Sequence, residues 1–333
     1  MIGRSTRSAL DEMRARHALR EAGLRDDVPL ERASSVTNES WLTPHFAVRV
    51  NRHPTQRLRR EAGLSGSLPP EAGYPGVVAH GGRSGADWLI TTRANGHPLS
   101  RWWTDMTDES RRSAIHQLAY RLQAIHQTTP PPDVGDTPSP QLVSGLRSSA
   151  VVPLLNAIEE LRRHKYVDKL LLERAANFAR QGGSTLDPWD DQHLVHGDVH
   201  FENLMWDGFE ITAFLDFEYA RPGPPDLDLD ILLRCCAYPG MHVAPDYEDT
   251  VHRAHFVNVI PWMAEAYPEL FANPRLMERA RLYSIGFDLN DLRAHPPSGP
   301  FAQLPDQHPM HRLERTLNGE GYVADLLGMV TTA

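Results

Sequence analysis

The sequence predicts an α+β fold in two lobes, a small β-rich N-terminal lobe and a larger, mostly helical C-terminal lobe. Short apolar runs with β character lie early in the chain, at about residues 29–36, 45–51, 76–80 and 87–92. From residue 110 onward, apolar residues recur instead at helical spacing. We expect a nucleotide-binding lobe of residues 1–95, a hinge at about 92–96 and a helical lobe of residues 97–333.

The composition is that of a globular protein without membrane segments. The chain has 333 residues, enough for two lobes around a cleft, and no apolar run approaches the roughly 20 residues that span a bilayer. Residues 1–24 are charged throughout and lack the apolar core of a signal peptide, so a cytoplasmic location is expected. The only cysteines, Cys235 and Cys236, are adjacent in a predicted helix, which disfavours a disulfide and excludes a cysteine-built zinc site.

The charges are unevenly distributed along the chain. The formal net charge is −9, and residues 187–249 hold fifteen Asp and Glu against two Arg and no Lys. Residues 1–62 hold twelve Arg against eight acidic residues. This distribution does not predict the single basic face that binds nucleic acid. The acidic centre instead suits metal ions and a cationic small-molecule substrate, although individual carboxylates in it could simply be solvated.

The helices of both lobes are predicted from composition and periodicity. In the N-terminal lobe, residues 8–24 and the charged segment 55–68 have helical character. In the C-terminal lobe, a helix from about residue 110 carries a core-facing stripe and ends at the prolines of 130–132. Further helices are expected at about residues 153–165, 167–181, 227–237, 247–267 and 275–292. One interruption, residues 193–218, holds the most informative polar residues.

That interruption contains two apolar runs, each followed by polar residues. The first run leads into the sequence HGDVHFEN, residues 196–203, in which Asp198 and Asn203 are five residues apart. Asp216 follows thirteen residues later, at the end of the second run. In phosphoryl transfer, a carboxylate orients the attacking hydroxyl and accepts its proton. Mg²⁺ neutralises the triphosphate and binds hard oxygen ligands, so one Asn and one further Asp could hold it without closing the site.

The motif resembles the aminoglycoside phosphotransferase and choline kinase family, which shares the protein-kinase-like fold. Residues 196–203 fit that family's H-G-D-x-x-x-x-N loop, and residues 216–218 fall where protein kinases carry D-F-G. The resemblance implies that Asp198 is the catalytic base and that Asn203 and Asp216 are magnesium ligands. ATP or GTP is then the phosphoryl donor. His196 is interpreted as a packed residue that shapes the loop.

A second segment extends the resemblance. Residues 223–229 resemble the family's G-x-P-x-x-D-L, with Asp228 at the acidic position, so the combined pattern spans more than thirty residues. Glu218 departs from the glycine of D-F-G, and the sequence leaves open whether it contacts metal. A rival interpretation is a two-metal phosphoesterase, because Asp198 and His200 form D-x-H. That class also needs G-D-x-x-D and G-N-H elements, which do not occur after residue 200.

The N-terminal lobe holds the residues expected to bind the nucleotide. Residues 33–41 resemble the family's phosphate-covering turn, with Ser34, Ser35 and Asn38 as candidates, although the segment has no glycine and could be an ordinary polar hairpin. The family commonly places a Lys on the next strand, where this chain has Arg49, and Glu61 is its expected partner. The strand-to-hinge residues Thr92 and Ala94 are expected beside the nucleobase.

The acceptor is the least defined part of the prediction. An antibiotic of aminoglycoside type is the first choice, because the acidic centre suits a polycation and the family resemblance points the same way. Relatives also act on macrolides, cyclic peptides, amino-alcohols and glycated amines. A metabolite kinase and a catalytically inactive nucleotide-binding regulator are the alternatives, the latter because Arg49 and the glycine-free turn depart from the family. Candidate substrate-side residues are His200, Glu202, Glu218, Asp288 and Asp291.

Overall fold

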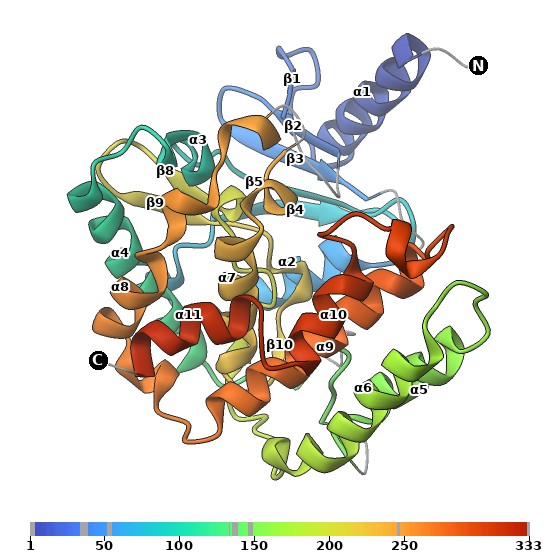
Figure 1. Ribbon diagram of the computed structural model, residues 1–333. Helices are drawn as coiled ribbons and strands as arrows, with labels where there is room; N and C mark the ends of the chain where they lie inside the picture. Colours follow the sequence, from blue (N-terminus) through green and yellow to red (C-terminus); the bar gives the residue numbers. More distant parts are fainter. Residues whose placement is uncertain are drawn as a thin grey trace.

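The computed structural model describes residues 4–33, 39–51, 55–132, 134, 139–145, 149–244 and 247–331. They form a β-sheet-rich N-terminal region and a helical C-terminal region (Figure 1). This is the two-lobed α+β arrangement that the sequence predicts. No helix in the described part of the chain is long and apolar enough to cross a membrane.

The N-terminal region is built on an antiparallel five-stranded sheet with the order β1-β2-β3-β5-β4. The strands are β1 (Glu31–Arg32), β2 (Glu39–Leu42), β3 (Phe46–Val50), β4 (Val77–Gly81) and β5 (Trp88–Thr92). Three predicted β runs correspond closely to β3, β4 and β5, and the run at 29–36 contains β1. Strand β2 begins within the segment 33–41 that the sequence predicts as a polar turn, so part of that segment is paired in the sheet.

The two faces of the sheet contact different helices. Val48, Val50 and Ile90 face α1 (Arg4–Glu21) and form one apolar cluster with it. Because successive strand residues point to opposite faces, Arg49 and its cross-strand neighbour Leu89 lie on the other side. Leu89 packs there against Leu58 and Ala62 of α2 (Arg57–Ser65). The alternation therefore places the Arg49 side chain on the α2 side of the sheet.

The C-terminal region consists of helices with short strands between them. The helices are α3 (Leu99–Trp103), α4 (Asp108–His126), α5 (Val152–Leu161), α6 (Lys169–Gly182), α7 (Asp226–Ala237), α8 (Val259–Ala266), α9 (Leu276–Ala294), α10 (Pro309–Leu317) and α11 (Tyr322–Thr331). The strands are β6 (His97–Pro98), β7 (Leu194–Val195), β8 (Leu204–Trp206), β9 (Ile211–Phe214) and β10 (Arg221–Pro222). They form a β6-β8-β9 sheet and a β10-β7 pair.

One predicted helix is wrong over half its length. Residues 247–267 were expected to be helical throughout, but only Val259–Ala266 form the α-helix α8, preceded by two short 3-10 turns. Pro261 explains the boundary. Its ring would clash with the carbonyl of residue 257 in a continuous helix, and it has no N–H to donate, so the helix begins just before it. The helices at 153–165, 167–181, 227–237 and 275–292 are confirmed as α5, α6, α7 and α9.

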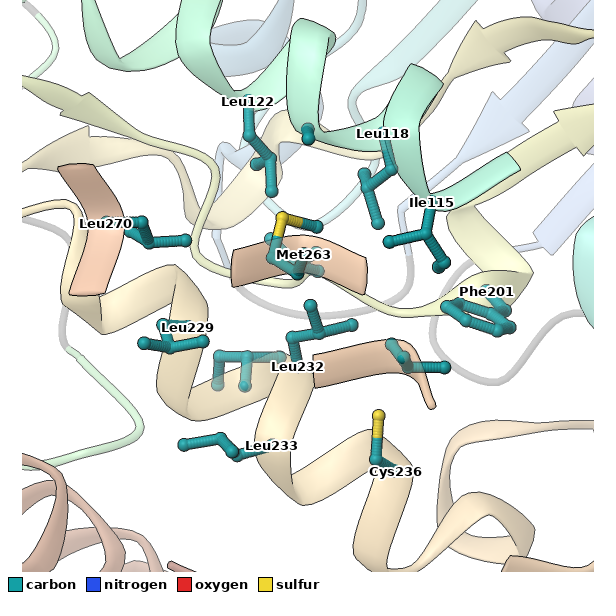
Figure 2. Close-up of a cluster of buried hydrophobic side chains, with 14 of the residues drawn as sticks. Ile115, Leu118, Leu122, Phe201, Leu229, Leu232, Leu233, Cys236, Met263 and Leu270 are labelled. Atoms are coloured by element: carbon teal, nitrogen blue, oxygen red, sulfur yellow. The ribbon is translucent and has the colours of Figure 1, made fainter. Parts of the chain in front are cut away.

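The larger hydrophobic core lies between α4, α7 and α8. Leu118 of α4, Leu232 of α7 and Met263 of α8 point toward one another in it (Figure 2). Phe201, which belongs to the H-G-D loop, is almost fully buried in the same core. Phe201 is therefore held by the packing of the three helices, and because it lies between Asp198 and Asn203 in the sequence, this packing restricts the position of the loop. A second core lies beneath α5, α6, α9 and α10.

Candidate active site

Gly197, which directly precedes Asp198, occupies a position where only glycine fits. Gly197 has φ +83°, and a Cβ at this position would lie 2.5 Å from the carbonyl oxygen of Tyr219. A side chain would therefore be strained by its backbone conformation and would also collide with a neighbouring main chain. The glycine lets the chain turn sharply after β7, so that Asp198 follows immediately.

Asp228, at the start of α7, holds the backbone of this loop. Its Oδ1 accepts from the N–H of Gly197 at 2.7 Å, and its Oδ2 accepts from the N–H of His196 at 2.8 Å. His126 Nε2 lies 3.0 Å from the same Oδ2. Burial would raise the pKa of Asp228, but its hydrogen bond and charge interaction with His126 and the hydrogen bond from the Gly197 N–H lower it. Asp228 is thus an ionised, fully buried anchor for the loop.

His196 is part of the packed loop, as the sequence predicts. Its Nε2 donates to the carbonyl of Leu215 at 2.9 Å, and its Nδ1 accepts from the N–H of Asp198 at 3.2 Å. The ring stacks on Phe214 with centroids 4.1 Å apart. This pattern of one donor and one acceptor requires a neutral imidazole, and burial does lower the pKa of His196.

Asp198 is partly exposed, and its described side-chain contacts come from two neighbours. Asn203 Nδ2 donates to the Asp198 carbonyl at 2.9 Å and lies 3.3 Å from Oδ2. His200 Nε2 also lies 3.3 Å from Oδ2. Burial would raise the pKa of Asp198, but the charge and hydrogen bond of His200 lower it to about 2. The carboxylate is therefore ionised at neutral pH, as a group that must accept a proton requires.

Asp216 lies beside Asn203 because the two backbones are bonded. The N–H of Leu215 donates to the carbonyl of Asn203 at 2.8 Å. Asp216 itself has a left-handed backbone with φ +66°, unusual for a residue other than glycine. Strain of this kind persists only where the surrounding structure enforces it. The three residues predicted as base and magnesium ligands are thus brought together by the loop and the end of β9.

Arg49 links the sheet to these residues. Its Nη1 donates to both carboxylate oxygens of Glu61 at 2.7 and 2.8 Å, and its Nη2 donates to Asp216 Oδ1 at 2.6 Å. Tyr74 Oη donates to Glu61 Oε1 at 2.8 Å. The ion pair between Arg49 and Glu61 that the sequence predicts is formed. The planar guanidinium serves two carboxylates at once through separate nitrogens.

Two further arginines of α2 contact the segment of residues 218–220, which follows Asp216, and neither was predicted from the sequence. Arg57 Nη1 lies 3.3 Å from Glu218 Oε1 and 2.8 Å from Tyr219 Oη. Arg60 donates to the carbonyls of Val134 at 2.6 Å and Glu218 at 2.9 Å, and also to the carbonyl of Ala220. The only sequence signal was the charged composition of segment 55–68. Glu218 is buried between arginines, with Oε2 3.8 Å from Arg49 Nη2.

Other predicted site residues differ in their surroundings. Glu202 Oε1 accepts from the hydroxyl of Ser100, and its Oε2 lies 3.6 Å from Arg101. Thr92 ends β5 with its N–H bonded to the Gly76 carbonyl at 2.8 Å, so that N–H is occupied. Ala94 is half-buried two residues later. The residues predicted for the phosphate turn lie outside the described residues: Ser34, Ser35 and Asn38.

The two acidic residues of α9 do not support the predicted substrate role. Asp288 is fully buried, with Oδ1 3.1 Å from Arg234 and 2.8 Å from Arg312. Asp291 contacts the same two arginines at 2.8 and 2.5 Å, and its side chain is 25% exposed. Because both arginines are themselves buried, these carboxylates neutralise them inside the helical region. The side chain of Asp288 is therefore inaccessible to a substrate.

The donor set at Asn203 and Asp216 fits a magnesium ion. Asn203 directs its amide nitrogen to Asp198, which leaves its carbonyl oxygen for a cation. Asp216 contributes a carboxylate, the ligand type that Mg²⁺ prefers. Among the described residues, no three His, Cys, Asp or Glu are grouped to hold a metal ion. A magnesium ion here would use two protein ligands and take its remaining oxygens from phosphate and water.

Comparison with solved structures identifies the class of fold. The chain is similar to a thermostable mutant of aminoglycoside phosphotransferase APH(4)-Ia in complex with ADP and hygromycin B, at 17% identity and a TM-score of 0.56, covering 90% of this chain and 96% of that one. It is similar to ADP-bound APH(2'')-Ib at 14% identity and a TM-score of 0.58, with 90% and 95% covered. It is also similar to the GDP complex of aminoglycoside 2'-phosphotransferase-IIIa, at 16% identity and a TM-score of 0.57, with 90% of this chain and 93% of that chain covered. These likenesses show a protein-kinase-like fold.

The family is shown by the sequence itself. Residues 29–265 match the phosphotransferase enzyme family, which is well over half of the chain. The protein therefore belongs to that family. No curated protein matches the chain by sequence. The matched region contains both Arg49 and the loop with Asp198, so the family assignment and the site geometry concern the same residues.

Proposed function

We propose that the protein transfers the γ-phosphoryl group of ATP or GTP to a hydroxyl of a small-molecule antibiotic. The observation that carries this proposal is the grouping of Asp198, Asn203 and Asp216, with Arg49 bonded to Asp216 from the opposite region. Nucleotides occur in the similar structures, with ADP or GDP bound. The grouping supplies a proton acceptor, hard oxygen ligands and a cation for phosphate, which are the parts that in-line phosphoryl transfer uses.

In the proposed mechanism, Asp198 orients the acceptor hydroxyl and accepts its proton as the oxygen attacks the γ-phosphorus. Its low pKa keeps it ionised and ready to accept. Arg49, positioned by Glu61, binds the phosphates through its guanidinium. Asn203 and Asp216 would hold Mg²⁺, which when bound neutralises charge on the phosphate oxygens. No covalent intermediate with the protein is required.

An aminoglycoside is the first acceptor to test. Similar structures are named as complexes with hygromycin B, gentamicin and streptomycin, which are statements about those proteins. Support within this chain is the excess of acidic residues in the central segment 187–249. Several of these carboxylates are already paired with arginine or histidine, as Asp216 is with Arg49, so the test must include acceptors of lower charge.

The test is a nucleotide-consumption assay with Mg²⁺ against aminoglycosides, macrolides, peptide antibiotics and amino-alcohols, with ATP and GTP in parallel. Asp198→Ala should lower acceptor-dependent kcat by roughly 10²–10⁴-fold because the proton acceptor is lost. Nucleotide binding, measured by calorimetry, should be retained. Asp191→Ala, at an exposed aspartate in the preceding segment, is the matched control and should match the wild type.

Each outcome of the panel has a defined meaning. Turnover on an antibiotic that is lost in Asp198→Ala supports the proposal and identifies the acceptor class. Turnover restricted to amino-alcohols or glycated amines would replace the antibiotic acceptor with a metabolite. Nucleotide binding with no turnover on any acceptor would favour a nucleotide-binding regulator. Full activity in Asp198→Ala would refute the catalytic assignment.

A further inference from the structure

The Asp198 carboxylate is held at one oxygen only. Its described side-chain contacts, from Asn203 Nδ2 and His200 Nε2, both go to Oδ2 at 3.3 Å. Within the described residues, Oδ1 accepts no hydrogen bond, and the side chain is 29% exposed. One oxygen is thus fixed by the protein while the other remains accessible. A base that must receive a proton from an incoming hydroxyl needs this arrangement.

His200 directs its only bonded nitrogen at this carboxylate. Its Nε2 lies 3.3 Å from Asp198 Oδ2, whereas its buried Nδ1 has no hydrogen-bond partner within the described residues. Asn203 Nδ2, which can only donate, lies 3.1 Å from the same Nε2, so His200 serves the carboxylate when Nε2 carries the proton, and the two nitrogens then both point their N–H groups at Asp198. The neighbouring residues Val199 and Phe201 are buried in the core, which fixes the backbone on both sides. The ring of His242 lies 5.9 Å away, centroid to centroid.

We propose that His200 is a positioning residue that holds the Asp198 carboxylate in one rotamer, with Oδ2 bound and Oδ1 open to the acceptor. The proposal rests on the proposed function, in which Asp198 is the base. It changes the expectation from sequence, which placed His200 on the substrate side. The imidazole faces the base and acts on the acceptor only through it.

The positioning role of His200 follows from the contacts that Asp198 would keep if the imidazole were removed. The carboxylate of Asp198 would keep a single side-chain contact, from Asn203, whose amide also has to orient a carbonyl oxygen toward the metal. A terminal carboxylate has a broad rotational preference and is not confined by its own torsion. Misorientation of a catalytic group lowers the rate of the chemical step while leaving the binding of a distant part of the substrate intact.

The kinetic test compares His200→Gln with His200→Leu. Glutamine can place an amide N–H near the position of Nε2, whereas leucine keeps apolar volume and has no donor. We expect His200→Leu to lower acceptor-dependent kcat about tenfold or more, with the KM for nucleotide within about twofold of wild type. His200→Gln should recover most of the loss. His80→Leu, at an exposed histidine of β4, is the control and should leave kcat unchanged.

A crystal structure of His200→Leu with bound nucleotide gives a second, independent measurement. We expect the Asp198 carboxylate to occupy more than one orientation there, and a single wild-type orientation would overturn the proposal even if no acceptor had been found. An equal loss of kcat in His200→Gln and His200→Leu would also overturn the proposal, because a hydrogen-bond donor at this position would then make no difference to the rate. Failure of the wild type to turn over any acceptor would instead count against the proposed function.

Discussion

Two pairs of aspartates in this protein look alike in sequence and differ in structure. Asp198 and Asp216 lie in loops after short strands, and each remains partly exposed. Asp288 and Asp291 lie three residues apart on α9, where two buried arginines, Arg234 and Arg312, neutralise them. The first pair lies at the candidate site, whereas Asp288 is fully buried in the helical region and Asp291, although 25% exposed, shares the same two buried arginines. A carboxylate next to a predicted cleft is therefore informative only when its partners are known.

The partners of Asp198 and those of the α9 pair come from different distances along the chain, whereas Asp216 resembles the α9 pair in this respect, because its partner Arg49 is 167 residues away. Asn203 and His200 are within five residues of Asp198, so a motif read from sequence includes them. Arg234 is 54 residues before Asp288, and Arg312 is 24 residues after it. No local pattern connects them. The comparison predicts that changes in the first pair alter activity, whereas changes in the second pair alter stability.

The largest expected effect is at Asp216. Asp216→Asn keeps the size of the side chain but removes the charge that Mg²⁺ requires, and loss of several kcal/mol of charge stabilisation corresponds to a fall in kcat of roughly 100-fold or more. The activity that remains should need a higher Mg²⁺ concentration. The measurement is kcat as a function of Mg²⁺ concentration, with the melting temperature as a check of folding. Wild-type kcat and Mg²⁺ dependence in this variant would remove Asp216 from the site.

The second expected effect is a loss of stability at Asp288. Asp288→Ala leaves two buried arginines with one carboxylate, and breaking a buried pair costs about 3–5 kcal/mol. Asp291→Ala should cost less, because its 25% exposed position allows water to solvate the arginines. Urea unfolding measures both. The comparison between the two aspartate pairs would fail if Asp288→Ala were as stable as wild type and raised the KM of the acceptor.

The third expected effect is a smaller and pH-dependent one at Asp230 of α7. Burial raises the pKa of this carboxyl from 3.8 to about 7, while Gln141 and Tyr322 bond to it. Because the pKa is higher in the folded than in the unfolded state, raising the pH from about 4 to 7 removes stability from the wild type. Asp230→Asn cannot ionise and escapes this loss.

The measurement at Asp230 is the free energy of unfolding of both proteins between pH 5 and pH 8. The stability of Asp230→Asn relative to wild type should rise by on the order of 2 kcal/mol over this range. Parallel pH profiles for the two proteins would show that the carboxyl stays ionised when folded. Asp230 would then belong with Asp288 as a charge that its neighbours fully compensate.

Much of the fold could be predicted because its elements follow local periodicity. The strands β3, β4 and β5 and the helices α5, α6, α7 and α9 lie where the sequence placed them. The helix α10 was not predicted, and its buried face explains why. Arg312 and Thr316 lie there beside Met310 and Leu313, so the face is half polar, and the arginine is compatible with burial only through its partners on α9.

The site was predictable to the extent that one short motif contains it. The loop of residues 196–203 and Asp216 are local in sequence, and the pairing of Arg49 with Glu61 was expected from the family resemblance, which places a cation on this strand and its partner on the following helix. The anchoring of the loop by Asp228 was visible only as a position in a longer pattern. The arginines Arg57 and Arg60 could not be assigned, because their partners lie far along the chain and two of the bonds go to backbone carbonyls of residues 218 and 220.

The bonds of Arg60 have a consequence for how the two lobes can move. By sequence, α2 belongs to the N-terminal lobe, yet Arg60 donates to carbonyls of Val134, Glu218 and Ala220 in the other lobe. A cleft that opened by separating the lobes as rigid bodies would break all three bonds. The helix is equally bound to the sheet, because Leu58 and Ala62 pack against Leu89 and Glu61 binds Arg49. Any relative movement of the two lobes would therefore break contacts of α2 with one of them.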